Sequence, residues 1–431
     1  MGMLHRIARG LLACATWAAC LAAHAQAPAA TEAERVTTAR LVYGLVSDAR
    51  YAYRAQPFDD AMSSRVFDAY VHALERHGGT FDEAALQALG KYRQALDDAV
   101  KRGRLDPIYE IADRAGPRSR DESLAIFLNA YTRTVDQGTR YLSPFVDLPS
   151  AAGEKRARGA ASVATRSTVD IGGKRVDAIA VGALYGFAQG SVLRDVAQLL
   201  AASAQGGADG IVLDLRGSPG GALVEVVALA GLFLGPSPVM QIRETGGRVS
   251  VERTDRAAVW TGPLAVLVDG ETESGAEMLA AALRDSGRAL VVGERTAGLG
   301  TIQNPVDLDR GAPNRGQPAE PRFGQVVLTI AETFRLDGRP IHGAGVEPDI
   351  RLPSDRDRAA PSARIAVSDP IRPARGHVAS SPYDIAALVS RQQARAAGNE
   401  GSVDRLSGAA AVLVDAMAQR AAPAGASAST Q

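Results

Sequence analysis

The chain has 431 residues, 46% of them hydrophobic, and its 48 basic and 48 acidic residues give a formal net charge of zero. Its length allows two or three domains with apolar cores, and the balanced charge does not favour nucleic acid or an anionic membrane surface as a partner. Both cysteines, Cys14 and Cys20, lie within the first 25 residues. We therefore expect the remainder to contain no disulfide and no cysteine nucleophile.

Residues 1–25 have the pattern of a secretory signal peptide. A short basic start is followed by an apolar run from Leu11 to Ala22, which is too short to span a bilayer, and then by Ala23-His24-Ala25, a small-residue cleavage pattern. A buried N-terminal helix and a lipoprotein modified at Cys14 are weaker alternatives. The pattern predicts export to the periplasm and a mature chain without a transmembrane segment.

Residues 33–148 are predicted to form a helical N-terminal domain. Apolar residues recur at spacings of three and four in 66–79, and Gly78-Gly79 ends that pattern. A second helix is predicted over 81–103, and a third over 121–135.

Residues 149–175 are small and charged without periodicity, which indicates a linker. From 176 to 353, short apolar runs alternate with helical patterns, which is typical of an α/β core with a mainly parallel sheet. Sites in such sheets gather where strands end and helices begin. Residues 354–431 are predicted to form a helical segment and a disordered tail.

The loop Asp214–Gly221 leaves a predicted buried strand and opens a helix. Its glycines would let backbone N–H groups face an anion or an oxyanion. A tight strand-to-helix turn without any ligand explains the same residues.

Ser274 follows the predicted strand 264–268 and opens a helix, where unpaired N–H donors suit a nucleophile whose attack creates an oxyanion. Ser274 and Glu277 also fit a capping box, a purely structural role. The glycine-containing loop 295–303 would lie beside Ser274 if consecutive strands are neighbours. His342 and Glu273 are weaker candidates for a base.

Together, these segments resemble the C-terminal processing (tail-specific) serine proteases. The matching segments are DLRGSPGG at 214–221, VLVDGETESGAEMLAAALRDSGRALVVGERT at 266–296 and DGRPIHGAGVEPDI at 337–350. Residues 66–111 and 124–144 are similar to the helical N-terminal part of the tail-specific branch. The resemblance implies a crotonase-like ββα protease core with a mixed, mainly parallel sheet, and a polypeptide substrate.

The resemblance places the nucleophile on Ser274 and the assisting glutamine on Gln303. It places the oxyanion hole on the backbone of Gly220 or Gly221 together with Gly275.

The family's base is a lysine in a Gly-Lys-Gly turn, 25 residues after the serine. This turn reads Gly298-Leu299-Gly300 here. A Ser–Lys dyad needs a neutral amine to accept the hydroxyl proton, and leucine cannot accept it. His342 would be an alternative base.

The family's PDZ domain, which recognises substrate C-termini, has no counterpart, because the 31 residues at 145–175 are too few to fold alone. The sequence thus predicts a periplasmic peptidase-like protein that is impaired at Leu299. Alternatives are a non-cutting protein that binds peptides or regulates an active protease, and, less favoured because CoA is cytoplasmic, an acyl-CoA enzyme. Neither a cofactor nor a metal site is expected, because the histidines are scattered and the carboxylates lack ligand spacing.

Overall fold

The computed structural model describes residues 29–148, 164–184, 186–187, 190–311, 321–352, 367–374, 381–398 and 404–421. The predicted signal peptide and C-terminal tail lie outside these ranges. The chain forms two compact units: the first comprises residues up to 149 together with 303–330, and the second comprises 150–302 together with 331–431.

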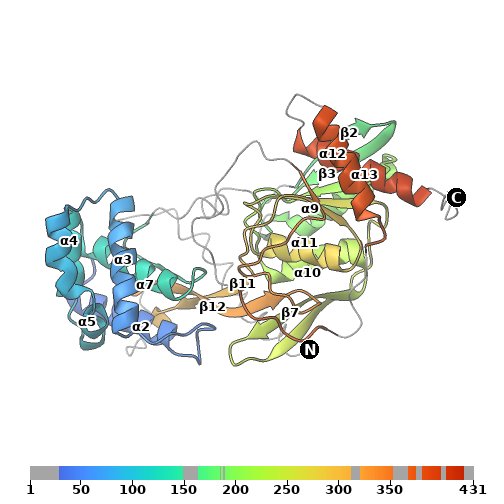
Figure 1. Ribbon diagram of the computed structural model, residues 1–431. Helices are drawn as coiled ribbons and strands as arrows, with labels where there is room; N and C mark the ends of the chain where they lie inside the picture. The colour runs from blue at the N-terminus through green and yellow to red at the C-terminus, as the bar shows by residue number, and fades with distance from the viewer. Residues whose placement is uncertain are drawn as a thin grey trace. The chain divides into compact units, whose positions relative to one another are not determined.

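The first unit is mainly helical (Figure 1). Its helices are α2 (Glu32–Ser47), α3 (Asp60–Arg76), α4 (Glu83–Leu89), α5 (Leu96–Arg102), α6 (Asp106–Ala115) and α7 (Arg120–Val135), with short 3-10 turns η2 (Gly90–Tyr92) and η3 (Asp309–Gly311). Its strands are β1 (Arg140–Leu142), most of β11 (Thr301–Asp307) and the first part of β12 (Gln325–Phe334). Both β1 and β11 pair with β12.

The core of this unit is aromatic. Tyr70 and Phe127 are fully buried and meet edge to face with ring centroids 5.4 Å apart, while Phe58 stacks on Tyr131 at 4.4 Å. Such pairs add stability beyond the area that they bury.

The second unit is built on a six-stranded sheet of order β13-β10-β9-β6-β3-β2. Its strands are β2 (Thr165–Ile171), β3 (Lys174–Ala180), β6 (Gly210–Asp214), β9 (Leu264–Val268), β10 (Leu290–Gly293) and β13 (Ile350–Arg351). All neighbouring pairs are parallel except β2 with β3. This is the mixed, mainly parallel α/β core that the sequence predicts.

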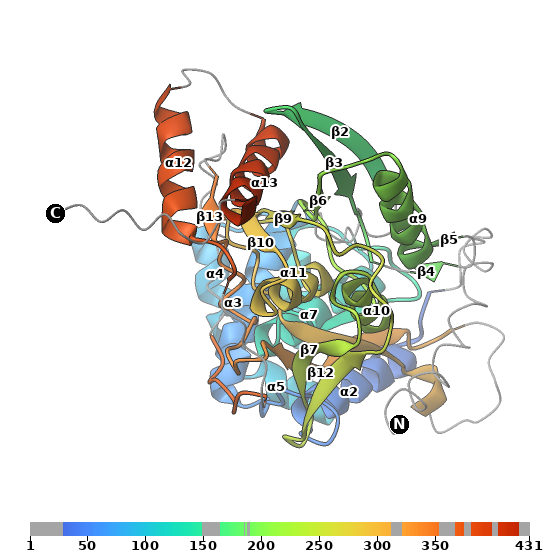
Figure 2. The same ribbon diagram turned by 90° about the vertical axis from the view of Figure 1, so that its right-hand side faces the viewer.

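Helices cover both faces of this sheet (Figure 2). One face packs against α9 (Val192–Gln205), α10 (Leu223–Leu234) and α11 (Gly275–Asp285), and the other against α12 (Ile385–Gly398) and α13 (Arg405–Ala421). Strand β9 shows how the strand period produces these layers. Val266 contacts the first set of helices, and its neighbours Ala265 and Leu267 contact the second. A strand whose two faces both pack against helices therefore needs a continuous run of apolar residues.

A second, antiparallel ladder in this unit joins β7 (Ser237–Glu244) to β8 (Val249–Thr254) and to residues 331–334 of β12. A two-stranded hairpin, β4 (Gly186–Phe187) with β5 (Gly190–Ser191), precedes α9.

Two local predictions need correction. The helix predicted over 81–103 is broken, because α4 ends at Leu89 and a 3-10 turn that begins at Gly90 separates it from α5. Strand β2 forms at 165–171, inside the segment predicted as a linker. It lies at the sheet edge with mostly exposed side chains, so it carries no apolar pattern.

Candidate active site

Three loops meet at the carboxyl ends of the adjacent parallel strands β6, β9 and β10. The Glu273 amide donates to the Ser218 carbonyl at 2.9 Å, which ties the loop after β9 to the loop after β6. The Ala297 amide donates to the Thr272 carbonyl at 3.0 Å, which ties in the loop after β10. The expected convergence of these loops is therefore present, at the edge where sheets of this type place their sites.

Ser274 is held in a strained backbone conformation at the start of α11. Its φ of 50° and ψ of −119° make it the one non-glycine residue with positive φ in the described part of the chain. Such a conformation costs about 1–3 kcal/mol and persists only when the surroundings impose it. It favours a functional role for Ser274 over simple helix capping.

The glycine loop packs directly against this serine. A Cβ atom on Gly220 would lie 2.4 Å from the Gly275 nitrogen, and one on Gly275 would lie 3.0 Å from the Gly221 nitrogen. Only glycines allow the two backbones to approach so closely. Neither the Gly221 nor the Gly275 amide donates a hydrogen bond to a described residue, so both are available to an oxyanion.

The carboxylate of Glu277 connects the serine to the loop after β10. It is fully buried and accepts four hydrogen bonds: from the Ser274 amide at 2.9 Å, the Gly298 and Leu299 amides at 2.7 Å each, and the Thr296 hydroxyl. Burial raises the pKa of Glu277 to about 7, although all four donors act to lower it. All four of these donors come from the backbone or from Thr296, so the carboxylate holds the serine loop and the loop after β10 in place.

Sequence reasoning assigned Glu277 only the capping role. The bond to the Ser274 amide is indeed half of a capping box, but the other donors lie 19 to 22 residues further along the chain. The local Ser-x-x-Glu pattern was the sole signal, and it could not reveal these partners.

Leu299 occupies a turn that is fixed through its backbone. Besides the bonds to Glu277, the Gly298 carbonyl accepts from the Gly343 amide at 2.9 Å. The Gly300 carbonyl accepts from the amide and the hydroxyl of Thr333 at 2.9 and 3.0 Å. These bonds do not depend on the side chain at position 299.

Ser274 makes no hydrogen bond or ion pair with a basic side chain among the described residues. Lys174, the described lysine of the same unit, pairs with Asp209 at 2.8 Å. It begins β3, at the opposite end of that strand from the site and thus roughly 20 Å away. Lys155 lies outside the described residues.

His342 is buried, and its backbone packs against the Leu299 turn: a Cβ atom on Gly300 would lie 2.4 Å from the His342 nitrogen. No hydrogen bond joins His342 to Ser274 in the described structure. Gln303 lies in β11, in the first compact unit, whereas Ser274 belongs to the second. Its amide nitrogen is 3.5 Å from the Thr329 hydroxyl.

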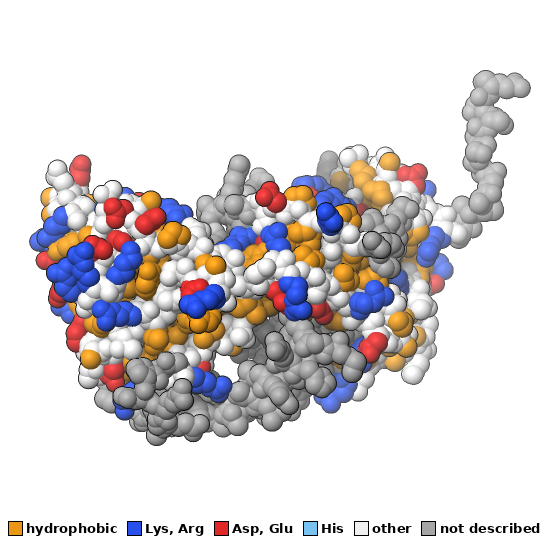
Figure 3. Space-filling view, turned by 90° about the horizontal axis from the view of Figure 1, so that it is seen from below, with side chains coloured by type: hydrophobic (Ala, Val, Ile, Leu, Met, Phe, Trp, Pro, Cys, Tyr) orange, Lys and Arg blue, Asp and Glu red, His pale blue; other side chains and the backbone are white. Residues whose placement is uncertain are grey.

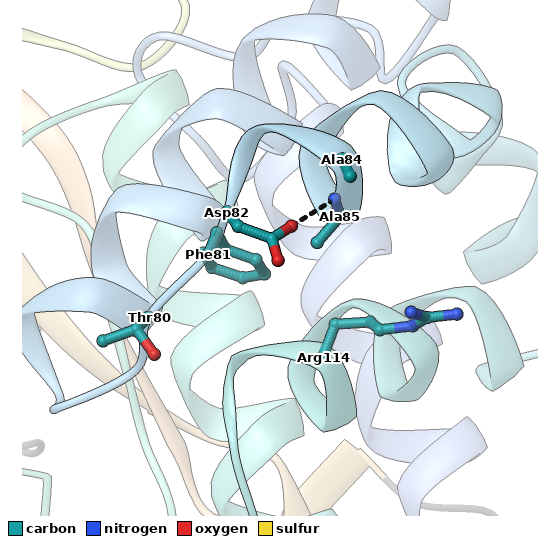
Figure 4. A pocket seen from close by; sticks show the side chains of 6 residues that line it. All are labelled: Thr80, Phe81, Asp82, Ala84, Ala85 and Arg114. Carbon is teal, nitrogen blue, oxygen red and sulfur yellow. Dashed lines mark hydrogen bonds between the residues drawn. The ribbon is translucent and has the colours of Figure 1, made fainter.

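A surface hollow in the helical unit contains none of the predicted site residues (Figure 4). Asp82 on its rim is committed to the start of α4, where it accepts from the Ala85 amide at 2.7 Å. The hollow is lined by Thr80, Phe81, Asp82, Ala84, Ala85 and Arg114.

The described residues contain no group of three or more His, Cys, Asp or Glu side chains placed to hold a metal ion. None of the helices within the described ranges has the length and apolar character to cross a membrane.

Residues 179–352, which include all three loops, match the family model of Peptidase family S41, and residues 48–123 match the tail specific protease N-terminal domain. This part of the chain is therefore similar to peptidase family S41. These matches confirm the resemblance drawn from the motifs.

Proteins similar to this chain include C-terminal processing proteases. The carboxy-terminal processing protease CtpA of Bacillus subtilis is 34% identical over 146 residues, covering 34% of this chain and 29% of that protein. The tail-specific protease of Haemophilus influenzae is 32% identical over 190 residues, covering 42% and 25%. The matched segments thus span roughly a quarter to a third of these relatives' length.

Among solved structures, the photosystem II D1 C-terminal processing protease is 26% identical, with 44% of this chain and 48% of that chain covered and a TM-score of 0.38.

Proposed function

We propose that this chain is a periplasmic, tail-specific-peptidase-like protein that engages C-terminal or unfolded polypeptide segments at Ser274 but cleaves them poorly, because Leu299 replaces the base. Its family supports a polypeptide substrate, and the apolar, A-x-A-terminated residues 1–25 support export. The described surface mixes basic and acidic side chains on the face shown in Figure 3, which agrees with the zero net charge.

The observation that carries this proposal is that no basic side chain among the described residues bonds to Ser274, although the backbone around it is in place. The strained Ser274 supports a nucleophile position, and the amide of Gly220 or Gly221 together with that of Gly275 supports an oxyanion hole. Attack by a serine hydroxyl requires a neighbouring group that takes its proton. Removing the base from a comparable serine protease costs about a millionfold in turnover.

A second candidate is a protein that binds peptides, or regulates an active protease, without cutting. Glu277 is committed to four backbone and hydroxyl donors, and Ser274 bonds to no basic side chain within the described ranges. Both observations favour this candidate over an efficient enzyme with another base. The two candidates differ in whether Ser274 can be acylated.

Four proteins spanning 26–431 separate these cases: wild type, Ser274→Ala, Leu299→Lys and Leu299→Met. Methionine is a matched control, because it is unbranched like lysine but cannot accept a proton. Each protein is incubated with a loosely folded substrate and with a fluorophosphonate probe. We expect cleavage and labelling to increase by at least a hundredfold in Leu299→Lys and to stay at the wild-type level in Leu299→Met.

Cleavage by the wild type that disappears in Ser274→Ala and does not increase in Leu299→Lys would overturn the proposed impairment. Substrate binding without labelling in any of the four proteins would favour the non-cutting candidate.

A further inference from the structure

A buried polar cluster in the first compact unit surrounds one end of Gln303. The Asp136 side chain is 7% exposed, and its Oδ2 atom accepts three hydrogen bonds. The donors are the Thr329 hydroxyl at 2.5 Å, the Thr139 hydroxyl at 3.1 Å and the Gly138 amide at 3.1 Å. The Gln303 Nε2 atom lies 3.5 Å from the same Thr329 hydroxyl.

These bonds can run in one direction only. A carboxylate oxygen accepts and cannot donate, so Thr329 must commit its single proton to Asp136. The Thr329 oxygen then has only lone pairs to offer to Gln303. The amide nitrogen, not the amide oxygen, must therefore face Thr329.

The backbone leaves little room for another arrangement. A Cβ atom on Gly138 would lie 2.5 Å from Gln303 Nε2 and 2.8 Å from the Thr329 hydroxyl. The Thr139 hydroxyl accepts from the Thr329 amide at 3.1 Å, which fixes the strand segment that carries Thr329.

We propose that Asp136 is a positioning residue that acts through Thr329 to orient the Gln303 carboxamide, with its nitrogen toward Thr329 and its oxygen turned away as a hydrogen-bond acceptor. The assisting role of Gln303 rests on the proposed function, so the effect of Asp136 on reactivity rests on it as well. The orientation of the Gln303 carboxamide is independent of the proposed function.

The orientation is tested without any activity, through the exchange rate of the Gln303 side-chain amide protons with water in [15N]glutamine-labelled protein. Gln303→Ala assigns these protons by their loss. We expect Thr329→Val and Asp136→Ala to raise the rate about tenfold, roughly the loss of one hydrogen bond. Thr329→Ser, which keeps the hydroxyl, should retain the wild-type rate. Thr132→Val removes another buried hydroxyl of the same unit and should leave the rate unchanged.

Thr329→Val is the decisive variant, because valine has the shape of threonine and a high strand propensity, whereas Asp136→Ala can fail to fold. An unchanged exchange rate in folded Thr329→Val would overturn the proposal. An equal rise in Thr132→Val would overturn it too, since the effect would then reflect loosening of the whole unit.

The effect on Ser274 is measured as the fluorophosphonate labelling rate in the Leu299→Lys background. We expect Thr329→Val and Gln303→Ala each to slow labelling about tenfold, and the double variant to be no slower than Gln303→Ala alone. If the two substitutions slow labelling multiplicatively in the double variant, Thr329 does not act through Gln303, and this part of the proposal is overturned. Altered exchange with no labelling in any background would support the orientation while rejecting the proposed function.

Discussion

Replacing Glu277 by glutamine tests whether burial or hydrogen bonding has the larger effect on the pKa of Glu277. Glutamine keeps the shape, but its NH₂ group carries two protons where the protonated carboxyl of Glu277 carries one, so one more buried donor loses its acceptor. Each buried donor left without an acceptor costs about 1–3 kcal/mol. We therefore expect Glu277→Gln to be less stable than the wild type at pH 5.

The difference in stability between the wild type and Glu277→Gln should change with pH. Burial raises the pKa of Glu277 from 4.5 to about 7, so the folded protein binds more protons than the unfolded chain between these values. The contribution of Glu277 to stability is therefore fully present below pH 4.5 and is lost as pH rises through 7. A shift of this size corresponds to about 3 kcal/mol. Glutamine does not titrate, so the stability gap should narrow by about that amount between pH 5 and pH 8.

Urea unfolding of both proteins at pH 5, 6, 7 and 8 measures this gap directly. A gap that widens with rising pH would refute the reasoning. It would mean that the four donors outweigh burial and that the pKa of Glu277 is lowered on folding.

Two further substitutions test the glycine loop and the core. Gly220→Ala places a methyl group 2.4 Å from the Gly275 nitrogen at a φ of +74°, so it should abolish Ser274 labelling in the Leu299→Lys background. Gly182→Ala, which meets nothing within 4 Å, is the control and should label normally; equal labelling in both would contradict the close approach. Asp285→Ala leaves the Arg335 guanidinium without its buried, bidentate partner, and urea unfolding at pH 7 should show a loss of about 3–5 kcal/mol. A loss below about 1 kcal/mol would show that the pair is solvated.

The sequence predicted the strands whose side chains are buried along their whole length. Strands β6, β9 and β10 are buried on both faces and read as continuous apolar runs. Strand β8 was missed because Val249 and Val251, its apolar residues, are exposed. Its residues therefore reveal no buried face.

The site was predictable in outline because it follows from strand order. Once β6, β9 and β10 are adjacent and parallel, their following loops must meet. The contacts inside the site were not predictable, because they join residues across the chain. The Thr272 hydroxyl donates to the Leu215 carbonyl across 57 positions, and no local pattern around either residue indicates this bond.

The hydrogen bonds around Leu299 hold its turn without help from the side chain at this position, which is what the proposed function requires. The turn is held by the amides of Gly298 and Leu299 and by the carbonyls of its two glycines. None of these atoms belongs to the side chain at position 299. Under the proposed function, a single substitution at this position removes proton transfer but leaves the backbone around Ser274 unchanged. For the same reason, a lysine introduced at position 299 enters a turn that is already in place, which is why we expect one substitution to suffice.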